Sequence, residues 1–536
     1  YSQRLRRRSE AAARWRGLDR RISNLRLAVF VAIVAAAWFA LGAKTLGIGW
    51  LALPIAIFVT LLPIHDRVIR SRDRANQAVA YYERSLARLE HRWQGNGEPG
   101  DEFRDTRHPY AEDLDLFGHG SLFELLCTAR TRAGEQTLAS WLREPTQPES
   151  IRARQAAVEE LRQRIDLRED LALLAGDVRV GLHPEELRSW GSAKPILLSP
   201  GHRIAALVLV SCTLAALLGW ILGPSGPIPV LLAIAIEAGY AVPLRNRVRR
   251  VIGTVDAPGR DLNLFAGLLA RLEQEQFQAP LLVELRAALD TRGGPPSRRI
   301  ASLHRRIERL DARRNQLFLP VALLLLWTTQ LALAIERWRS VCGPSLGRWI
   351  DAVGEFEALC ALAGYAYEHP GHPFPEIADG GSCFEARAIG HPLISPALCV
   401  RNDIRLGEEL RVLVVSGSNM SGKSTLLRTL GTNAVLAHAG APVCAAHLRL
   451  SPLAIGASIC VRDSLREGTS HFYAEITRMR QVMALAEAPG STLFLLDEIF
   501  HGTNSHDRGI GAEAVVRGLL ELSLIHISEP TRPAPL

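Results

Sequence analysis

The stretch that decides the fold is residues 412–425, which read Val412-Leu413-Val414-Val415-Ser416-Gly417-Ser418-Asn419-Met420-Ser421-Gly422-Lys423-Ser424-Thr425. A run of β-forming residues leads into the pattern G-x-x-x-x-G-K-S, and a helix-compatible run follows it. A strand, a glycine-rich loop and a helix in this order are the context that confirms a Walker A phosphate loop. The stretch therefore predicts a nucleotide-binding α/β domain.

Each part of this loop has a role in holding a triphosphate. The glycines allow backbone N–H groups to wrap the phosphates, and the helix N-terminus adds a partial positive charge. Lys423 can reach the β- and γ-phosphates, and the Ser424 hydroxyl can bind Mg²⁺. We therefore expect ATP and Mg²⁺ as ligands, with the nucleotide held by Gly417, Ser418, Asn419, Met420, Ser421, Gly422, Lys423, Ser424 and Thr425.

A second stretch, residues 492–498, supplies the acids that such a site needs. It reads Thr492-Leu493-Phe494-Leu495-Leu496-Asp497-Glu498, an apolar strand that ends in two carboxylates. Asp497 is expected to hold the Mg²⁺ shell, and Glu498 to orient or deprotonate the attacking water. The alternative is a buried strand with a solvated acidic end. The position about 75 residues after the phosphate loop favours a hydrolytic site.

Length, charge and cysteine usage limit the number of domains, the class of partner and the redox compartment. The 536 residues can hold two to four domains, and the formal net charge is +8. Much of the basic excess lies beside apolar segments, so it does not require nucleic acid as a partner. The eight cysteines contain no C-x-x-C pair, which argues against a zinc site or a disulfide framework and for a reducing compartment.

Two segments have the pattern of transmembrane hairpins. A basic segment, 1–26, carries nine arginines and two acids and precedes two apolar runs within 27–64. The pattern recurs in 204–243, which contains Glu237 and is followed by four arginines. The runs are near the minimum length of a bilayer span, and their basic outer flanks predict soluble parts in the cytoplasm, at a bacterial-type inner membrane.

Other interpretations of these segments stay open. A buried soluble helical hairpin would give the same apolar pattern, and Glu237 suits either an ion path or a contact with the neighbouring helix. The arginine rows suit anionic lipid headgroups more simply than phosphate backbones of nucleic acid.

The remaining chain reads as a helical core in two parts, followed by the nucleotide-binding domain. We expect the core at 75–200 and 255–366, with amphipathic helices at 112–142, 149–176 and 345–366. Residues 316–335 are strongly apolar, and we expect a buried core helix there rather than a fifth span. The linker is 369–383 and the ATPase domain 384–522, with strands expected at 384–389, 412–416, 452–460 and 492–496. The tail 523–536 resembles translated sequencing-adapter read-through and is expected to be an artefact outside the fold.

Four linked motifs resemble those of the MutS ATPases. The loop Gly417-Ser-Asn419-Met420 with the following G-K-S-T is similar to their nucleotide loop, and 439–443 (A-G-A-P-V) follows as it does there. Ser470-His-Phe-Tyr-Ala-Glu475 is similar to their S-x-F-x-x-E segment, and 497–507 to their D-E-x-x-x-G-T-x-x-x-D. A weaker resemblance to the MutS core gives a match over about 112–180 and 255–522. The fold class that follows is an α/β P-loop ATPase domain plus an all-α MutS-like core, with two transmembrane hairpins.

The resemblance implies a composite site in a homodimer. Ser470 would reach the γ-phosphate bound by the partner subunit, Asn419 would contact the phosphates or Mg²⁺, and Asp507 would lie across the dimer seam. The sequence departs from mismatch-reading members because its first Phe, Phe30, lies in an apolar span, and because the hairpin 204–243 occupies much of the interval of the DNA clamp. His501 stands where repair members usually carry arginine. The resemblance therefore implies nucleotide hydrolysis more strongly than mismatch reading.

Three functions compete at this point. The first is a membrane-anchored MutS-type ATPase that couples hydrolysis to mismatched or branched DNA. The second is a transporter ATPase of the ABC type, although an S-G-G-Q-type signature is absent and four spans make a thin channel. The third is a membrane scaffold that uses ATP as a conformational switch. Stimulation of hydrolysis by DNA would favour the first, stimulation by a transported substrate the second, and indifference to both the third.

Overall fold

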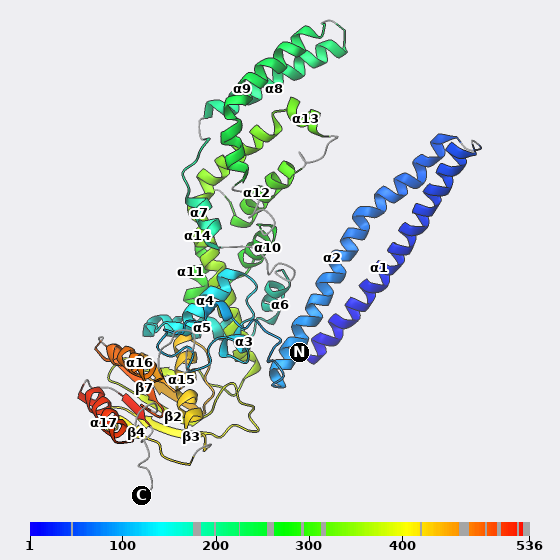
Figure 1. Ribbon diagram of the computed structural model, residues 1–536. Coiled ribbons are helices and arrows are strands. Elements are labelled where there is room, and N and C mark those ends of the chain that lie inside the picture. The colour runs from blue at the N-terminus through cyan, green and yellow to red at the C-terminus, as the bar shows by residue number, and fades with distance from the viewer. Residues whose placement is uncertain are drawn as a thin grey trace. The chain divides into compact units, whose positions relative to one another are not determined.

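The computed structural model describes most of the chain and divides it into two units, Tyr1–Gly97 and Glu98–Leu536 (Figure 1). The described residues are 1–43, 45, 47–174, 184–197, 200–223, 226–253, 262–290, 294–311, 318–418, 421–459, 471–487, 490–500, 505–521 and 525–528.

The first unit is a pair of long helices, α1 (Ser2–Ala37) and α2 (Ala52–Leu89), that lie side by side (Figure 1). The basic segment 1–26 and the first apolar run form one continuous helix. Apolar side chains on both helices face outward, and Leu27, for example, is 63% exposed. A contiguous exposed apolar surface of this kind marks a site of interaction with a protein, a ligand or a membrane.

Polar contacts join α1 and α2 near the basic end of the second apolar run. Asp19 Oδ1 lies 2.9 Å from His65 Nε2, and Arg72 donates a hydrogen bond of 2.8 Å to Asp19 Oδ2. The hydrogen bonds from His65 and Arg72 hold the pKa of the Asp19 carboxyl below its usual value, although burial opposes them. The two helices are therefore fixed in register where the apolar surface ends.

The helical part of the second unit is built around one 42-residue helix, α14 (Trp327–Glu368). It packs against helices from both sides of the second hairpin, so it joins the two predicted parts of the core (Figure 1). It also crosses α7 closely, because a Cβ added to Gly343 would lie 2.2 Å from the Gly191 carbonyl oxygen. The other helices are α3 (Leu122–Leu126), α4 (Arg132–Arg143), α5 (Pro148–Arg162), α6 (Ile165–Leu174), α7 (Pro184–Ser192), α8 (Pro200–Ile221), α9 (Ile228–Gly253), α10 (Leu262–Glu273), α11 (Pro280–Ala288), α12 (Pro296–Asp311) and α13 (Leu319–Leu324).

The single helix expected at 112–142 is wrong. The side chain of Ser121 accepts a hydrogen bond from Glu124 N and begins the short helix α3. The side chain of Thr131 accepts one from Gly134 N and begins α4. Ser and Thr compete with helical backbone bonds in this way, so they start helices rather than continue them. The helix expected at 149–176 is also divided, into α5 and α6.

The buried core helix expected at 316–335 is found only in the second half of the segment, where Leu331, Leu333 and Ile335 of α14 are buried. The described part of this segment is broken at Leu326, which has a φ of 45° in the left-handed region. The short α13 lies before the break and exposes Leu323 to 68%. Residues after the break belong to α14, which continues through Pro344 and absorbs the helix expected at 345–366.

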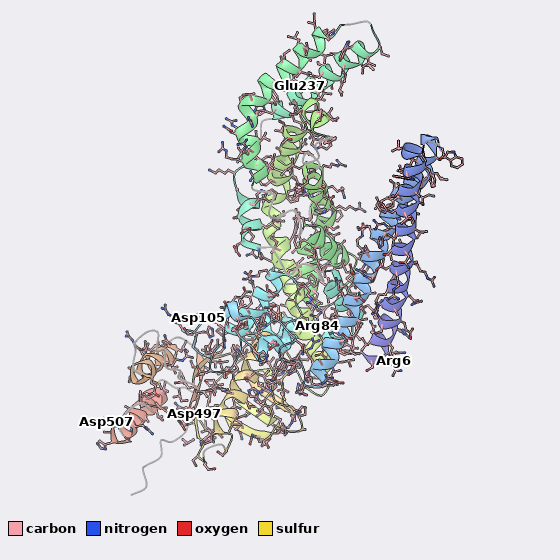
Figure 2. All side chains as sticks on the ribbon, turned by 45° about the vertical axis from the view of Figure 1, so that its right-hand side comes forward. Arg6, Arg84, Asp105, Glu237, Asp497 and Asp507 are labelled. Carbon is pink, nitrogen blue, oxygen red and sulfur yellow. The ribbon has the colours of Figure 1, made fainter. Side chains whose placement is uncertain are left out.

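The second hairpin consists of α8 and α9, which pack against each other (Figure 1). Glu237 lies on α9, as labelled in Figure 2, and is 3% exposed. Its Oε1 accepts a hydrogen bond of 2.5 Å from the Thr213 hydroxyl of α8. Of the two interpretations of Glu237, the structure therefore shows the contact with the neighbouring helix. Among the described residues, four helices are long and apolar enough to cross a membrane: Ser2–Gly42, Gly49–Leu89, Gly201–Ile221 and Ile228–Gly253.

The C-terminal part of the second unit holds two four-stranded sheets. One sheet, in the order β1-β5-β2-β3, is mixed and consists of Glu376–Ile377, His447–Leu450, Phe384–Ile389 and Asn402–Leu406. The other, in the order β4-β8-β7-β6, is parallel and consists of Val412–Val414, Ile525–Ser528, Ser491–Leu496 and Leu453–Ser458. The helices of this part are α15 (Lys423–Ala439), α16 (His471–Ala486) and α17 (Ser505–Glu521).

Strand β8 lies inside the tail 523–536, which the sequence analysis had set outside the fold. Its two isoleucines alternate with polar residues and pair on both sides, with β4 and with β7. β-branched residues at alternate positions suit a strand with neighbours on both edges.

Candidate nucleotide site

The parallel sheet places the phosphate loop and the two acids at one edge. Strands β4, β8 and β7 run in the same direction, and Ser528 of β8 pairs with both Val414 and Leu496. Because neighbouring strands lie about 4.8 Å apart, the ends of β4 and β7 are about 10 Å apart. The loop after Val414 and the acids after Leu496 therefore leave the same carboxyl edge, where α/β sheets bind their ligands.

The backbone of the phosphate loop has the conformation of a helix-opening turn. Gly422 has a φ of 89°, a value that favours glycine, and is the N-cap of α15. Gly417 is also constrained, since a Cβ there would lie 2.8 Å from Ser421 Oγ. No acidic residue occupies the first turn of α15, which leaves its positive end to an anion. Asn419 and Met420 lie outside the described residues.

Lys423 is held at the mouth of this loop. Its Nζ donates hydrogen bonds of 3.1 Å each to the carbonyl oxygens of Gly417 and Ser418. The ammonium thus lies over the loop that would wrap the phosphates. Ser424 and Thr425, which follow it at the helix start, are exposed. Their hydroxyls are therefore accessible to a nucleotide and its metal ion.

The acids after β7 differ in their surroundings. Asp497 donates its backbone N–H to the Ser458 carbonyl oxygen at 2.9 Å, which ties the acid strand to β6. Its Oδ1 is buried and has no hydrogen-bond partner among the described residues. A buried carboxylate oxygen without a donor is costly in an apolar setting and suits a hard cation such as Mg²⁺. The donor set thus fits the metal ion that the sequence predicts.

Glu498 is exposed and has a φ of 44°. A non-glycine residue in the left-handed region costs about 1–3 kcal/mol and persists where its surroundings fix it. Such strain is common at active sites, and here it turns the chain sharply just after the metal-binding candidate. Of the residues assigned by the resemblance, Asp507 is exposed in the first turn of α17, whereas Ser470 and His501 lie outside the described residues.

A cluster of hydrogen bonds and one ion pair, which no sequence motif indicated, joins the ATPase domain to the start of the helical core. Arg478 of α16 donates hydrogen bonds to the carbonyl oxygens of Ala457, at 3.1 Å, and His108, at 2.6 Å, and also pairs with Asp113. Asp113 is 3% exposed, and its Oδ1 accepts a hydrogen bond of 2.8 Å from Ile459 N. No local pattern could reveal the contacts that His108 and Asp113 make with Arg478 and Ile459, because these residues are more than 300 positions apart in sequence.

A second ion pair connects the same segment of the core to the phosphate-loop helix. Arg428 of α15 donates a hydrogen bond of 2.7 Å to Asp115 Oδ2. Gly431, one turn further along, has no room for a side chain, because a Cβ would meet Leu114 at 2.5 Å and Leu495 at 2.7 Å. The segment 108–115 therefore contacts both α15 and α16, the helices on which Lys423 and Arg478 lie.

Burial of His438 at the end of α15 predicts a loss of stability in acid. Burial lowers the pKa of this imidazole to about 4, whereas an unfolded histidine titrates near pH 6.5. The unfolded chain therefore binds this proton first, so stability falls as pH falls from about 6.5 to 4, by roughly 3 kcal/mol from this residue. We expect the unfolding midpoint of His438→Leu to depend less on pH in that window than wild type. The exposed His119 provides the control, and a His119→Leu chain that loses as much pH dependence would contradict the assignment.

Comparisons with known proteins agree with this site. Residues 413–526 match MutS domain V, and residues 106–198 match MutS domain III. The chain is 36% identical over 160 residues to "Endonuclease MutS2" of Thermomicrobium roseum, covering 29% of this chain and 19% of that protein. It is 37% identical over 142 residues to "Endonuclease MutS2" of Thermus thermophilus, covering 26% and 18%. It is 33% identical over 184 residues to "DNA mismatch repair protein msh3" of Aspergillus terreus, covering 33% and 16%.

The chain spans less than a fifth of the length of each of these three relatives. The domain matches are longer than the motifs and include the segment 108–115 and most of the parallel sheet. The chain therefore contains regions similar to MutS domains III and V, and MutS domain V is an ATPase domain.

Proposed function

We propose that this chain is a membrane-anchored MutS-type ATPase that hydrolyses ATP at a site completed by a second copy and couples hydrolysis to DNA. The observation that carries the ATPase part is the shared edge of β4 and β7, from which both the loop that precedes Lys423 and the pair Asp497–Glu498 leave the sheet. The Oδ1 of Asp497, which is buried and has no hydrogen-bond partner within the part of the chain that the structure describes, supports Mg²⁺ as the companion of the nucleotide.

Each residue then has a separate task. The N–H groups of the phosphate loop and the start of α15 bind the phosphates, and Lys423 adds a positive charge beside them. Ser424 and Asp497 would hold Mg²⁺, which when bound offsets charge on the phosphate oxygens. Glu498, exposed beside this site, is placed to accept a proton from the attacking water.

Exposure of the phosphate loop supports a second copy as part of the site. Gly417, Ser418, Ser421 and Gly422 are all exposed at the surface. A nucleotide bound there would have one side open to water, and electrostatic stabilisation of a transferring phosphoryl group is much weaker in water than in a closed site. In the dimer proposed from the resemblance, Ser470 of the partner subunit would cover that side.

Membrane anchoring is proposed from the outward-facing apolar residues of the candidate spans. On the hairpin α8–α9, Ile221 is 71% exposed, Ile228 is 75% exposed and Leu231 is 64% exposed. An exposed apolar surface of this extent is unfavourable in water and suits hydrocarbon. Sedimentation with the membrane fraction after a carbonate wash would support the anchor, and release into the soluble fraction would overturn it.

The proposed link to DNA rests on the relatives alone, since two of them are named endonucleases and one a DNA mismatch repair protein. The test is ATP hydrolysis by the full chain in lipid nanodiscs, with and without homoduplex, mismatched and branched DNA. A rate that rises with one DNA structure supports the coupling. An unchanged rate in the presence of a measurable basal ATPase would overturn the DNA part and leave the ATPase assignment standing.

Replacement of Lys423 tests the phosphate site directly. A hydrogen bond to a charged group is worth about 1.5–3 kcal/mol, so we expect Lys423→Ala to weaken ATP binding by roughly 10- to 150-fold. The measurement is equilibrium binding of a fluorescent ATP analogue in detergent. The nearby Arg428→Ala, on the same helix but paired with Asp115, is the control for general damage to α15. Wild-type affinity in Lys423→Ala would contradict the site.

A further inference from the structure

A cavity of about 790 Å³ lies where α9, α13 and the start of α14 meet. Its volume is that of a small-molecule site. Aliphatic side chains supply most of its wall, among them Ile234, Val248, Ile252, Leu323 and Leu324. The lining also includes Val242, which is 69% exposed, and Leu323, which is 68% exposed. The cavity is therefore continuous with the outward-facing apolar surface of the proposed membrane hairpin, and an apolar chain could enter it sideways.

The part of α9 that lines the cavity carries charges of both signs. Arg245 and Arg249 line the cavity and are exposed, and neither makes an ion pair or hydrogen bond with another described residue. Glu237 lies nearer the hairpin turn on the same helix, and one of its carboxyl oxygens accepts the hydrogen bond from the Thr213 hydroxyl. Twelve residues of α9 separate Glu237 from Arg249, which is about 18 Å along a helix. The two exposed arginines thus lie farther from the hairpin turn than the buried acid.

A second, independent group of cations lies near the start of α14. Burial lowers the pKa of the Arg306 guanidinium, and the neighbouring cations Arg203, Arg305 and Arg309 lower it further, against an opposing effect of Cys342. The indole N–H of Trp327, the first residue of α14, donates a hydrogen bond of 2.8 Å to the Arg309 carbonyl oxygen. These arginines therefore lie close together near the start of α14, where repulsion between their positive charges costs energy.

We propose that this cavity binds one anionic phospholipid, with an acyl chain among the aliphatic side chains and the phosphate on Arg245 and Arg249. Guanidinium groups bind phosphate through paired, charge-assisted hydrogen bonds. A zwitterionic phospholipid carries the same phosphate, but its headgroup cation is repelled by the two arginines, so a headgroup with net negative charge binds more tightly. This lipid site rests on the proposed membrane anchoring. The proposal goes further than anchoring, because an anchor needs only general hydrophobic contact, whereas this site selects a lipid headgroup.

The experiment compares two lipids on the full chain in a neutral detergent after delipidation. Phosphatidylglycerol and phosphatidylcholine with identical acyl chains are titrated, and bound lipid is counted by native mass spectrometry. We expect phosphatidylglycerol to bind at least tenfold more tightly and with a stoichiometry of one. Equal binding of the two lipids would overturn the proposal. Glycerol 3-phosphate is the third ligand, and binding as tight as that of the lipid would show a free phosphate site instead.

Two matched double variants separate the cavity from general surface charge. Arg245→Gln with Arg249→Gln is expected to reduce the preference for phosphatidylglycerol at least tenfold. Arg247→Gln with Arg250→Gln removes the same charge from residues of α9 that do not line the cavity, and is expected to keep the preference. An equal loss in both variants would overturn the proposal. Ala238→Trp, which would fill part of the cavity, is expected to weaken binding of both lipids.

Two further measurements distinguish a failure of the lipid site from a failure of the proposed membrane anchoring. The thermal unfolding midpoint of each variant in detergent shows whether it is folded. Partition into the membrane fraction, measured for wild type and both double variants, reports anchoring, and a failure of anchoring would appear in all three. Loss of the headgroup preference in the Arg245–Arg249 variant alone, with anchoring retained, is the result that the site requires.

Discussion

The variant Glu498→Gln is expected to hydrolyse ATP about 10²- to 10⁴-fold more slowly than wild type while binding ATP–Mg²⁺ with nearly unchanged affinity. The amide has the shape of the carboxylate but cannot take a proton from water. Asp497 and Lys423, which hold the metal ion and phosphates in the proposed site, remain in place. An interaction made mainly in the transition state lowers kcat when it is removed and leaves ground-state binding intact.

The measurement is single-turnover hydrolysis in detergent, with nucleotide affinity determined separately on the same preparation. Glu513→Gln is the matched control, since Glu513 is an exposed carboxylate of α17 that pairs with Arg517 at 2.7 Å. We expect that control to hydrolyse ATP at the wild-type rate. A Glu498→Gln protein with normal kcat would show that another group activates the water, and the assignment would then be wrong.

The variant Arg478→Ala is expected to lower the free energy of unfolding of the ATPase domain by about 3–5 kcal/mol. Arg478 and Asp113 are both largely buried, with side chains 12% and 4% exposed. Loss of the guanidinium leaves the Asp113 carboxylate buried without its cation and also leaves the carbonyl oxygens of Ala457 and His108 without this donor. The connection between α16 and the segment 108–113 should therefore loosen before the sheet unfolds.

Urea unfolding followed by hydrogen exchange of α16 and of residues 108–115 measures both effects. Arg517→Ala removes an exposed ion pair on α17 and should cost less than about 1 kcal/mol. A double replacement, Arg478→Ala with Asp113→Ala, is expected to cost less than the sum of the single changes, because no uncompensated charge is left. If Arg478→Ala costs no more than Arg517→Ala, the buried pair does not hold the two domains together.

The sequence predicted the nucleotide-binding half of the fold well, because its signals are local. The strand expected at 384–389 is β2 with the same bounds, and the strand expected at 492–496 is β7 extended by one residue. Each of its signals can be recognised within a few residues of sequence. These signals are apolar runs, glycines that permit a positive φ, and paired acids. The long apolar helices were legible for the same reason, since hydropathy and length are properties of one segment.

The features that sequence analysis missed depend on partners that are distant in the chain. Strand β5 pairs with β1 and β2, and neither of those pairings has a local signature. Helix α14 joins two segments that were expected to be separate, because packing on several helices outweighs the cost of Pro344 inside it. The acids Asp113 and Asp115 look like ordinary turn residues in the sequence, and only the fold shows that they meet arginines of α16 and α15.

The close crossing of α14 with α7 at Gly343 has a mechanical consequence. The crossing divides α14 into arms of 16 residues toward Trp327 (343 − 327) and 25 residues toward Glu368 (368 − 343). At 1.5 Å per residue these arms measure about 24 Å and about 38 Å. If α14 tilts as a stiff rod about this fulcrum, a displacement at Glu368 moves Trp327 in the opposite direction by about two-thirds as much. The end of α14 near the hairpin α8–α9 would then move less than the end at Glu368, in the opposite direction and with greater force.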